Sequence, residues 1–411
     1  MNRRSFLASV VAVTAGCAGG YEGSCEQLGG TDQLDVGTPV TEVTDTSGRW
    51  PTPYGPFDGT RFVRESGRYT GPVKRAWRRT TEAFVGGDGS YLLADRGLVL
   101  TGGTLYAVAE VNYEETELVA IDPTDGRVLW RDDTINITGS VVAGPELLYL
   151  RDEGTLVAFD PDRQEVVWRV QFGMRRRVSV PVVDGKRVFV QVTGGDGGGR
   201  LYALRDGQRE WNTPASAGPV VADGRLYTIS DETVKAVAPD SGELLWTSAL
   251  EESSLDKLAA RGGRVYLTGS GVTAVDAASG DRLWSHSAPP GRTRRATVGH
   301  GRVYVPTRKV GVTWPRLYTY APGGSEPLSC GQLSSFTLSG PVVATDEVAV
   351  YPGVVETGED SNTGFLQAQR PDGTVEWRVT SSGGLGRVSM CAGCCSLFLF
   401  DNRKLRAFVF E

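Results

Sequence analysis

Short runs in which apolar and polar residues alternate occur along most of the chain, and this period of two predicts β-strands. One such run, residues 271–276, ends at an Asp, is followed by Ala-Ala-Ser-Gly, and resumes as a second short run that ends at Trp284. Asp and Ser favour local turns, and Gly280 can adopt the positive φ that tight turns require. Residues 274–284 therefore predict a β-hairpin.

The same hairpin recurs through the chain with varying fidelity. Most copies keep a Gly followed four residues later by a Trp, and one copy has Gln164 in the Gly position. Another pair of short strands precedes each hairpin, as in residues 218–229. Four strands in a repeat of about 35–50 residues are typical of a propeller blade. The residues that define the repeat are Gly126, Trp130, Trp168, Trp211, Gly242, Trp246, Gly280, Trp284 and Trp377.

Counting the outer strands predicts eight blades. Seven of these strands end in Trp, and an eighth, near residues 328–330, has a degenerate end without one. Residues 73–77 form a lone strand with no hairpin partner before it, whereas residues 388–410 supply three strands without a fourth. We expect the N-terminal strand to complete the last blade, because this closes the ring and removes the exposed strand edges.

The repeat, the blade count and the closure together resemble the PQQ-like eight-bladed β-propeller family, which includes quinoprotein dehydrogenases and outer-membrane-assembly lipoproteins. The resemblance covers residues 50–411, and residues 50–72 resemble a degenerate form of the leader that opens many such propellers. It implies an all-β fold of four-stranded antiparallel blades. Because one fold hosts many activities, the function must be argued from particular sites.

The first residues of the chain predict export rather than structure. Residues 1–16 have a charged start, with Arg3 and Arg4, and a short apolar run, and they resemble a twin-arginine (Tat) signal. The residues that end at Cys17 resemble a lipobox, so we expect lipid on Cys17 and a protein held at the outer face of the cytoplasmic membrane. The alternative is a plain secretory signal or uncleaved anchor with an incidental Cys. Residues 17–49, rich in Gly, Thr, Asp and Ser, predict a flexible tether.

Composition narrows the class of partner. The chain has 411 residues, 54 of them Gly and 3 of them Met, and a formal net charge of −6. The turn-rich composition fits one closed repeat unit, which we expect to be monomeric. The net charge offers no support for a nucleic-acid partner. A twin-arginine lipoprotein of this composition resembles those of halophilic archaea, where a role in outer-membrane assembly could not apply.

Family topology implies that the loops leading into the inner strands share one face with the loops between second and third strands. Longer second-to-third loops are expected in the first, third, sixth and seventh blades, and the same face carries clustered arginines. Such a face is a candidate site for an anionic ligand or a partner surface. The alternative is that these are solvated charges on ordinary loops, mixed with Glu114, Glu115, Glu356, Glu359 and Asp360. The candidate arginines are Arg175, Arg176, Arg177, Arg292, Arg294 and Arg295.

The cysteines predict disulfides in an exported protein, although five remain besides Cys17, an odd number. The candidates are Cys330, Cys391, Cys394 and Cys395. The adjacent Cys394–Cys395 pair resembles the vicinal disulfide of PQQ alcohol dehydrogenases, but it falls in the last blade, on the face opposite to the candidate loops. A zinc site built from the same cysteines is conceivable, and we rank it below a disulfide.

No catalytic motif is present, and the repeat Trp and Gly are expected to be structural. We therefore expect a non-catalytic binding or scaffold protein with an unidentified cell-envelope protein as partner, and no metal or cofactor. The alternative is a dehydrogenase, or a quinone-binding relative, that would bind PQQ and Ca²⁺ in the central funnel. Asn136-Ile-Thr138 is an N-glycosylation sequon that fits an exported surface loop.

Overall fold

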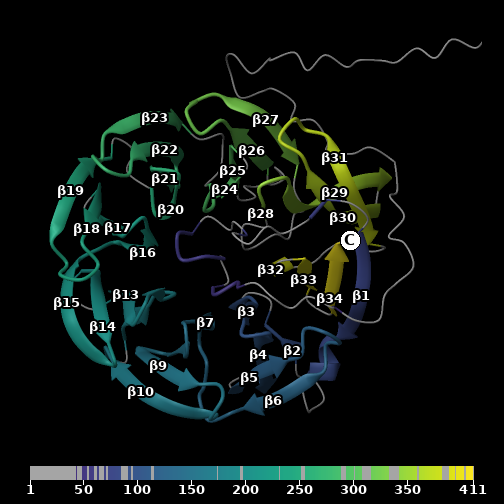
Figure 1. Cartoon of the computed structure of the whole chain (residues 1–411), viewed down its shortest axis with the longest axis horizontal. Helices are drawn as coiled ribbons and strands as arrows, with labels where there is room; N and C mark the ends of the chain where they lie inside the picture. The colour runs from purple at the N-terminus through teal and green to yellow at the C-terminus, as the bar shows by residue number, and fades with distance from the viewer. Residues whose placement is uncertain are drawn as a thin grey trace, which may run out of the picture.

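The computed structural model is a ring of eight antiparallel sheets around a central axis (Figure 1). Each sheet is a blade with an inner strand near the axis and an outer strand at the perimeter. The structure describes residues 43, 49–52, 55–59, 63, 69–70, 73–84, 91–93, 96–112, 115–173, 175–194, 198–230, 232–250, 255–287, 293–299, 301–307, 316–332, 342–358, 361–381, 388–393, 395–401 and 404–410. The predicted all-β, eight-bladed propeller is confirmed.

The blades are numbered in chain order, and each reads from the axis outward. Blade 1 consists of β2 (Tyr91–Leu92), β3 (Val99–Thr101), β4 (Thr104–Asn112), β5 (Glu115–Ile121) and β6 (Val128–Asp132), and blade 2 of β7 (Val142–Ala143), β8 (Leu148–Asp152), β9 (Thr155–Asp160) and β10 (Glu165–Gln171). Blade 3 consists of β11 (Arg177–Val178), β12 (Val182–Asp184), β13 (Arg187–Thr193), β14 (Arg200–Arg205) and β15 (Gln208–Pro214). Blade 4 consists of β16 (Ala217–Ala222), β17 (Arg225–Ser230), β18 (Thr233–Val237) and β19 (Leu244–Ala249).

The second half of the ring repeats this arrangement. Blade 5 consists of β20 (Lys257–Arg261), β21 (Arg264–Thr268), β22 (Gly271–Asp276) and β23 (Arg282–Ser287), and blade 6 of β24 (Thr297–Gly299), β25 (Arg302–Pro306), β26 (Arg316–Tyr320) and β27 (Pro327–Gln332). Blade 7 consists of β28 (Val343–Ala344), β29 (Ala349–Gly358), β30 (Ser361–Gln369) and β31 (Val375–Ser381). Blade 8 consists of β32 (Val388–Ala392), β33 (Ser396–Asp401), β34 (Lys404–Phe410) and β1 (Val73–Thr80). The helix among the described residues is the short 3-10 turn η1 (Thr81–Phe84), and no described helix is long and apolar enough to span a bilayer.

A β-bulge recurs in the outer hairpin of the blades and orients the repeat Trp. In blade 5, Ala274 faces Trp284 while the next residue, Val275, faces Arg282, so Leu283 is the extra residue on the outer strand. A bulge of this kind twists the strand and redirects its side chains. As a result Trp284 is buried, and Leu283 is 44% exposed at the perimeter.

The repeat Trp and Gly join neighbouring blades. The indole N–H of Trp246 in blade 4 donates to the carbonyl of Ala277 in the hairpin turn of blade 5, at 3.1 Å. Gly280 in that turn has φ +81°, and a Cβ there would lie 2.5 Å from the Trp246 ring, so no larger residue fits without displacement. The Gln164 position keeps the same left-handed backbone, with φ 53°. The same contact is made by the pairs Trp77–Gly126, Trp168–Gly207 and Trp211–Gly242.

Aromatic pairs fill the core of successive blades. The repeat Trp of an outer strand packs against an aromatic ring from the second strand of its own blade, with ring centroids about 6 Å apart, a tilted geometry typical of stabilising aromatic pairs. The pairs are Tyr106–Trp130, Tyr149–Trp168, Phe189–Trp211, Tyr227–Trp246 and Tyr266–Trp284. In blade 6 Ser329 takes the Trp position of β27. A Trp is therefore missing there, as predicted, and the blade is present.

The ring closes through β1, which pairs with β34 from Val73↔Phe410 to Thr80↔Lys404. This confirms the predicted closure by an N-terminal strand. Because the two strands have no hairpin turn between them, Tyr69 takes the place of that turn. Its carbonyl accepts the Trp377 indole N–H at 2.8 Å, the bond that a hairpin carbonyl accepts elsewhere in the ring. Its hydroxyl, fully buried, donates to the carbonyls of Gly393 and Ser396.

Candidate functional site

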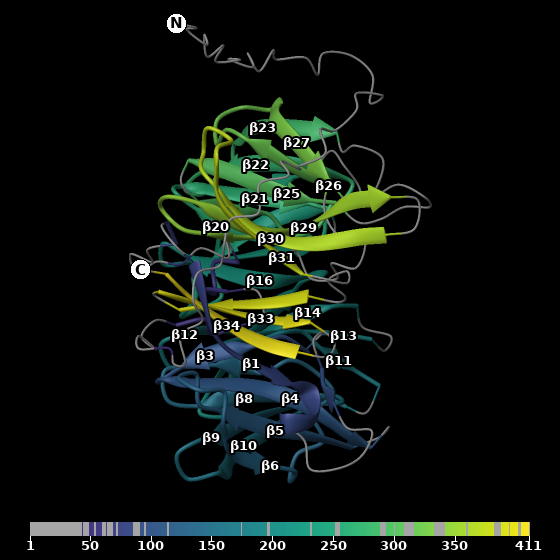
Figure 2. The same cartoon turned by 90° about the vertical axis from the view of Figure 1, so that its right-hand side faces the viewer.

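The propeller has two unlike faces. One face, here called the loop face, carries the loops that lead into the inner strands and the loops between second and third strands. The other, the turn face, carries the first-to-second and third-to-fourth turns, and the chain ends on that side after β34 (Figure 2). The antiparallel order of every blade fixes this division, because successive strands run in opposite directions across the ring.

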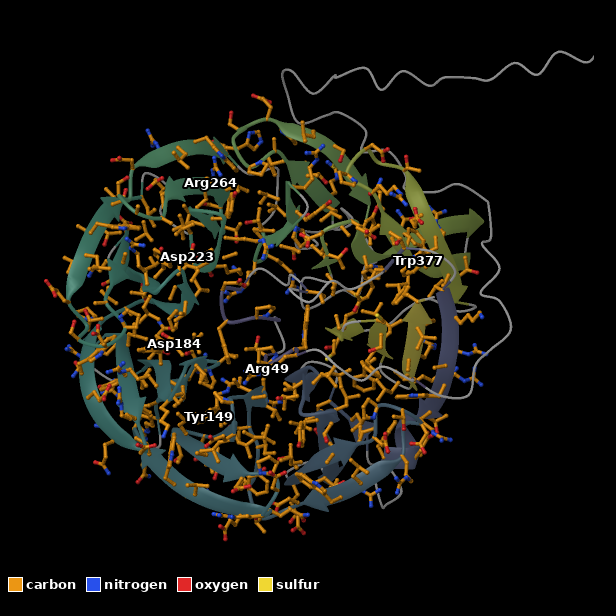
Figure 3. The ribbon with its side chains drawn as sticks, in the orientation of Figure 1. Arg49, Tyr149, Asp184, Asp223, Arg264 and Trp377 are labelled. Atoms are coloured by element: carbon orange, nitrogen blue, oxygen red, sulfur yellow. The ribbon has the colours of Figure 1, made fainter. Side chains whose placement is uncertain are left out.

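The segment of residues 49–70 is here called the leader, and its described residues lie at the turn-face ends of the inner strands. Trp50 exchanges backbone hydrogen bonds with Leu100 of blade 1, and the Pro51 carbonyl accepts the Ala143 N–H of blade 2 at 2.7 Å. Figure 3 shows Arg49 close to the axis, where its guanidinium donates to the Ala143 carbonyl and burial lowers its pKa. The leader therefore lies across the centre of the ring rather than beside it.

The leader continues to the other side of the ring. The Phe57 carbonyl accepts the Val221 N–H of blade 4 at 3.0 Å, and the Asp58 carbonyl accepts the Ala260 N–H of blade 5 at 2.8 Å. The Val63 N–H then donates to Ala344 of blade 7 at 2.8 Å. These bonds satisfy inner-strand groups that would otherwise face the axis without a partner strand. The described leader residues are thus bonded through their backbone to inner strands on opposite sides of the axis.

Contact with the propeller begins before the predicted start of ordered structure. Val43 lies within residues 17–49, the predicted tether, yet it is 1% exposed and its N–H donates to the Thr124 carbonyl at 2.8 Å. Thr124 belongs to the hairpin turn between β5 and β6, the turn that also receives the Trp77 indole N–H from blade 8 through the Pro123 carbonyl. The chain therefore meets the ring at the junction of blades 8 and 1.

A cavity of about 200 Å³ lies in the axial region. Its walls are the starts of the inner strands of blades 3 and 4, and the leader lines it on the turn-face side. Apolar groups predominate, and the polar side chains are Thr52, Ser179 and Arg295, of which Ser179 accepts the Gln191 N–H at 2.9 Å. The lining residues are Thr52, Pro56, Phe57, Gly59, Ser179, Val180, Pro181, Val182, Gly218, Pro219, Val220 and Arg295.

The leader and Arg295 fit together closely. Gly59 has φ +72°, and a Cβ there would lie 2.6 Å from the Arg295 guanidinium and 2.8 Å from the Leu258 carbonyl. The same guanidinium donates to the Leu258 carbonyl of blade 5. A glycine is thus required where the leader passes between Arg295 and blade 5, and this contact places the charge of Arg295 beside the cavity.

The structure separates the candidate arginines rather than bringing them together. Arg175, Arg176 and Arg177 lead into blade 3, with Arg175 and Arg177 exposed and Arg176 half-buried, whereas Arg294 and Arg295 lead into blade 6 and are half-buried. Blades 4 and 5 lie between the two groups. The residues left outside the described part are Arg292, Glu114, Glu359 and Asp360.

The expected long loop of blade 7 is in part strand. β29 and β30 pair as far as Gly358↔Ser361, so residues 355–358 and 361–364 extend the hairpin. The hairpin projects from the loop face in Figure 2, and the β4–β5 hairpin of blade 1 is extended in the same direction. The loop face is therefore uneven in height around the ring.

The cysteines lie away from that face. Cys395 is in the turn between β32 and β33, on the turn face as predicted. Cys391 on β32 carries a free, fully buried thiol, so this candidate does not join a disulfide, and burial raises its pKa. Cys330 on β27 is in a disulfide whose partner lies outside the described residues, as do Cys394, Cys17 and Cys25. Within the described part of the chain, no three His, Cys, Asp or Glu side chains form a metal-binding group.

The cavity does not suit a quinone with calcium. PQQ carries several carboxylates, for which Arg295 is the one cationic side chain of the lining. Ca²⁺ requires six to eight oxygen ligands, among them carboxylates, and the lining contains no Asp or Glu. Cavities that hold molecules of this size measure about 300–1,000 Å³, more than the space that the leader leaves. The described lining of this cavity therefore provides neither the charge nor the room for that pair.

Eight four-stranded blades, an N-terminal strand that completes the last blade, and Trp–Gly contacts between hairpins define a propeller of the PQQ-like repeat class. A europium-containing methanol dehydrogenase has a similar structure, with a TM-score of 0.61, 12% identity, and 89% of this chain and 98% of that chain covered. A quinohemoprotein alcohol dehydrogenase of Pseudomonas putida HK5 gives a TM-score of 0.61 at 12% identity over 88% and 80% of the two chains. These similarities show the fold alone.

A family profile described as outer membrane protein assembly factor BamB matches residues 114–219, 202–319 and 269–392. The chain belongs to this family. A solved structure of BamB from Moraxella catarrhalis is 14% identical over 82% of this chain and 98% of that chain, with a TM-score of 0.45, too low to support an argument. No curated protein matches the sequence.

Proposed function

We propose that the chain is a non-catalytic binding protein that recognises a cell-envelope protein through its loop face. The observation that carries this proposal is the course of the leader, which hydrogen-bonds to inner strands of blades 1, 2, 4, 5 and 7. The described leader residues thereby occupy the turn-face side of the axial region. A surface of unequal hairpins around the rim remains, and surfaces of this kind suit large partners.

Electrostatics support an acidic partner surface. Arg175 and Arg177 are exposed at the start of blade 3, on a protein whose net charge is −6. Exposed arginines at the rim of an interface raise the association rate and select against like-charged partners. Guanidinium groups also form two parallel hydrogen bonds to carboxylates. We therefore expect the partner to present Asp or Glu side chains to blade 3.

The proposed location is the outer face of the cytoplasmic membrane, with lipid on Cys17 after Tat export through the signal that contains Arg3 and Arg4. Support comes from the sequence of residues 1–17. The family description names an assembly factor for outer membrane proteins. We propose that this chain shares the scaffold role, with its own envelope partner.

Affinity purification after chemical crosslinking in intact cells tests the proposal. The double variant Arg175→Glu/Arg177→Glu should lose the crosslinked neighbour by at least tenfold. The matched control is Lys186→Glu, which reverses an exposed charge in the same blade but on the turn face, between β12 and β13. The control should retain the neighbour. Equal recovery with all three proteins, or no reproducible neighbour with the wild type, would contradict the proposal.

A titration separates this proposal from the dehydrogenase alternative. PQQ with Ca²⁺ is added to the purified protein, and quinone absorbance and dye-linked oxidation of alcohols and sugars are followed. We expect no saturable change in absorbance. Saturable binding together with dye reduction would replace the binding-protein proposal by the enzyme one.

A further inference from the structure

The outer edge of blade 8 carries a concentration of positive charge. β1 reads Val-Lys-Arg-Ala-Trp-Arg-Arg-Thr, and its partner β34 reads Lys-Leu-Arg-Ala-Phe-Val-Phe. Neither strand contains a carboxylate, so the pair has a formal charge of +6. The corresponding third and fourth strands of the other seven blades have net charges between −2 and +2. Blade 8 therefore differs from the rest of the ring, in a protein that is acidic as a whole. The cations, here called the basic edge, are Lys74, Arg75, Arg78, Arg79, Lys404 and Arg406.

The register of the two strands places like charges side by side. Arg78 faces Arg406 directly across the β1–β34 ladder. Like charges in this position destabilise a sheet. Arg78 and Arg79 are exposed, and the others are half-buried. The six cations gather on one edge of one blade, and a concentration of positive charge of this kind favours binding of an anionic surface.

The position of the basic edge on the chain indicates which anion. Val43, the described residue nearest to Cys17, is bonded to the Thr124 carbonyl in the hairpin turn of blade 1. The carbonyl of the next residue in that turn, Asp125, accepts a hydrogen bond from the Arg79 guanidinium at 2.9 Å. The N-terminal segment therefore joins the ring next to the basic edge. A chain held to a membrane by residues that precede Val43 would present this edge to the lipid headgroups.

We infer that the basic edge is a docking surface for a membrane that contains anionic lipids. The outer strand of blade 8 then lies on the headgroups, with the propeller axis parallel to the membrane and the loop face open to one side. Each Lys or Arg close to an anionic surface contributes about 1 kcal/mol to binding. The choice of a lipid surface rests on the membrane location proposed above, and vesicle binding can be measured without lipid on Cys17.

Vesicle sedimentation tests the inference. The full chain with Cys17→Ser is mixed with vesicles of equal parts phosphatidylglycerol and phosphatidylcholine, or with vesicles of phosphatidylcholine alone. We expect stronger binding to the anionic vesicles, decreasing as salt is added because the Debye length shortens. Arg78→Gln/Arg406→Gln should weaken anionic binding by about fivefold for each charge removed, close to thirtyfold for both. Its melting temperature should be equal to or higher than that of the parent, since the repulsion across the ladder is lost.

The matched control uses arginines at the same repeat position in other blades. Arg131 and Arg169 follow Trp130 and Trp168 as Arg78 follows Trp77, and they form ion pairs with Glu117 at 3.6 Å and Asp152 at 3.8 Å respectively. Arg131→Gln/Arg169→Gln should leave vesicle binding within twofold of the parent. Three results would overturn the inference: equal binding to both kinds of vesicle, equal loss in the control, or tighter binding of duplex DNA than of the anionic vesicles at the same salt concentration.

Discussion

Tyr69→Phe removes one oxygen atom from the point where the ring closes. The Tyr69 hydroxyl is fully buried and donates to the carbonyls of Gly393 at 2.6 Å and Ser396 at 2.8 Å, across more than 300 residues of chain. In the variant the Ser396 carbonyl keeps the Gly393 N–H as a donor, whereas the Gly393 carbonyl loses the Tyr69 hydroxyl. Leaving a buried acceptor without its hydrogen bond costs about 1–3 kcal/mol.

Urea unfolding measures the effect as a change in the midpoint at constant slope. The matched control is Tyr227→Phe, because Tyr227 is equally buried and its hydroxyl also bonds between blades, to the Ala277 carbonyl at 3.2 Å. That carbonyl keeps the Trp246 indole N–H as a second donor. The control should therefore lose less stability, about 0.5–1.5 kcal/mol. Amide exchange in β34 should accelerate in Tyr69→Phe alone. A loss no larger than that of the control, with unchanged exchange in β34, would refute the role of Tyr69 in closure.

Three further predictions concern packing, pH and thiol chemistry. In chemical denaturation, Gly280→Ala should destabilise the fold by about 1–3 kcal/mol more than Gly262→Ala. Both glycines have positive φ, but the new methyl group meets Trp246 only at position 280. Equal losses would show that the contact with Trp246 is not tight. Burial raises the pKa of three tyrosines to about 12 from the ordinary value of 10.0. Above pH 10 the unfolded chain therefore releases protons that the folded chain retains, so the free energy of unfolding should fall as pH rises from 10 toward 12. Thermal melts and tyrosinate absorbance check this, and ionisation with an ordinary midpoint in the folded protein would contradict it. The three residues are Tyr149, Tyr227 and Tyr266. Cys391 should resist alkylation until the protein unfolds, as peptide mass spectrometry can show, and rapid labelling of the native protein would disprove its burial.

The blades could be predicted because each is encoded locally. The turn residues before Gly280 and the Trp that follows it appear together within a dozen residues, and Gln164 shows that the left-handed turn persists without Gly. Closure could be predicted for the same reason, since a lone strand at residues 73–77 and a blade with three strands are visible in the alternation. The missing Trp of blade 6 changes one side chain, Ser329, and leaves the strand intact.

The leader could not be predicted in detail, because its contacts are backbone bonds to strands remote in the chain. Nothing in the residues around Trp50 or Phe57 specifies that their carbonyls and N–H groups meet blades 1 and 4. For the same reason the composition of residues 17–49 predicts a tether that includes Val43, although Val43 is buried. Arg295 was predicted as a surface arginine, yet it is half-buried beside the cavity because Gly59 allows the leader to approach it.

Photo-crosslinking from the two faces of one blade shows whether the partner protein binds the loop face. A photoreactive residue replaces Arg175 on the loop face or Lys186 on the turn face of blade 3, both exposed, and the chain is irradiated in intact cells. We expect one reproducible envelope protein to be captured from position 175 and none from position 186. Capture of that protein from position 186 alone, or equally from both positions, would contradict recognition through the loop face.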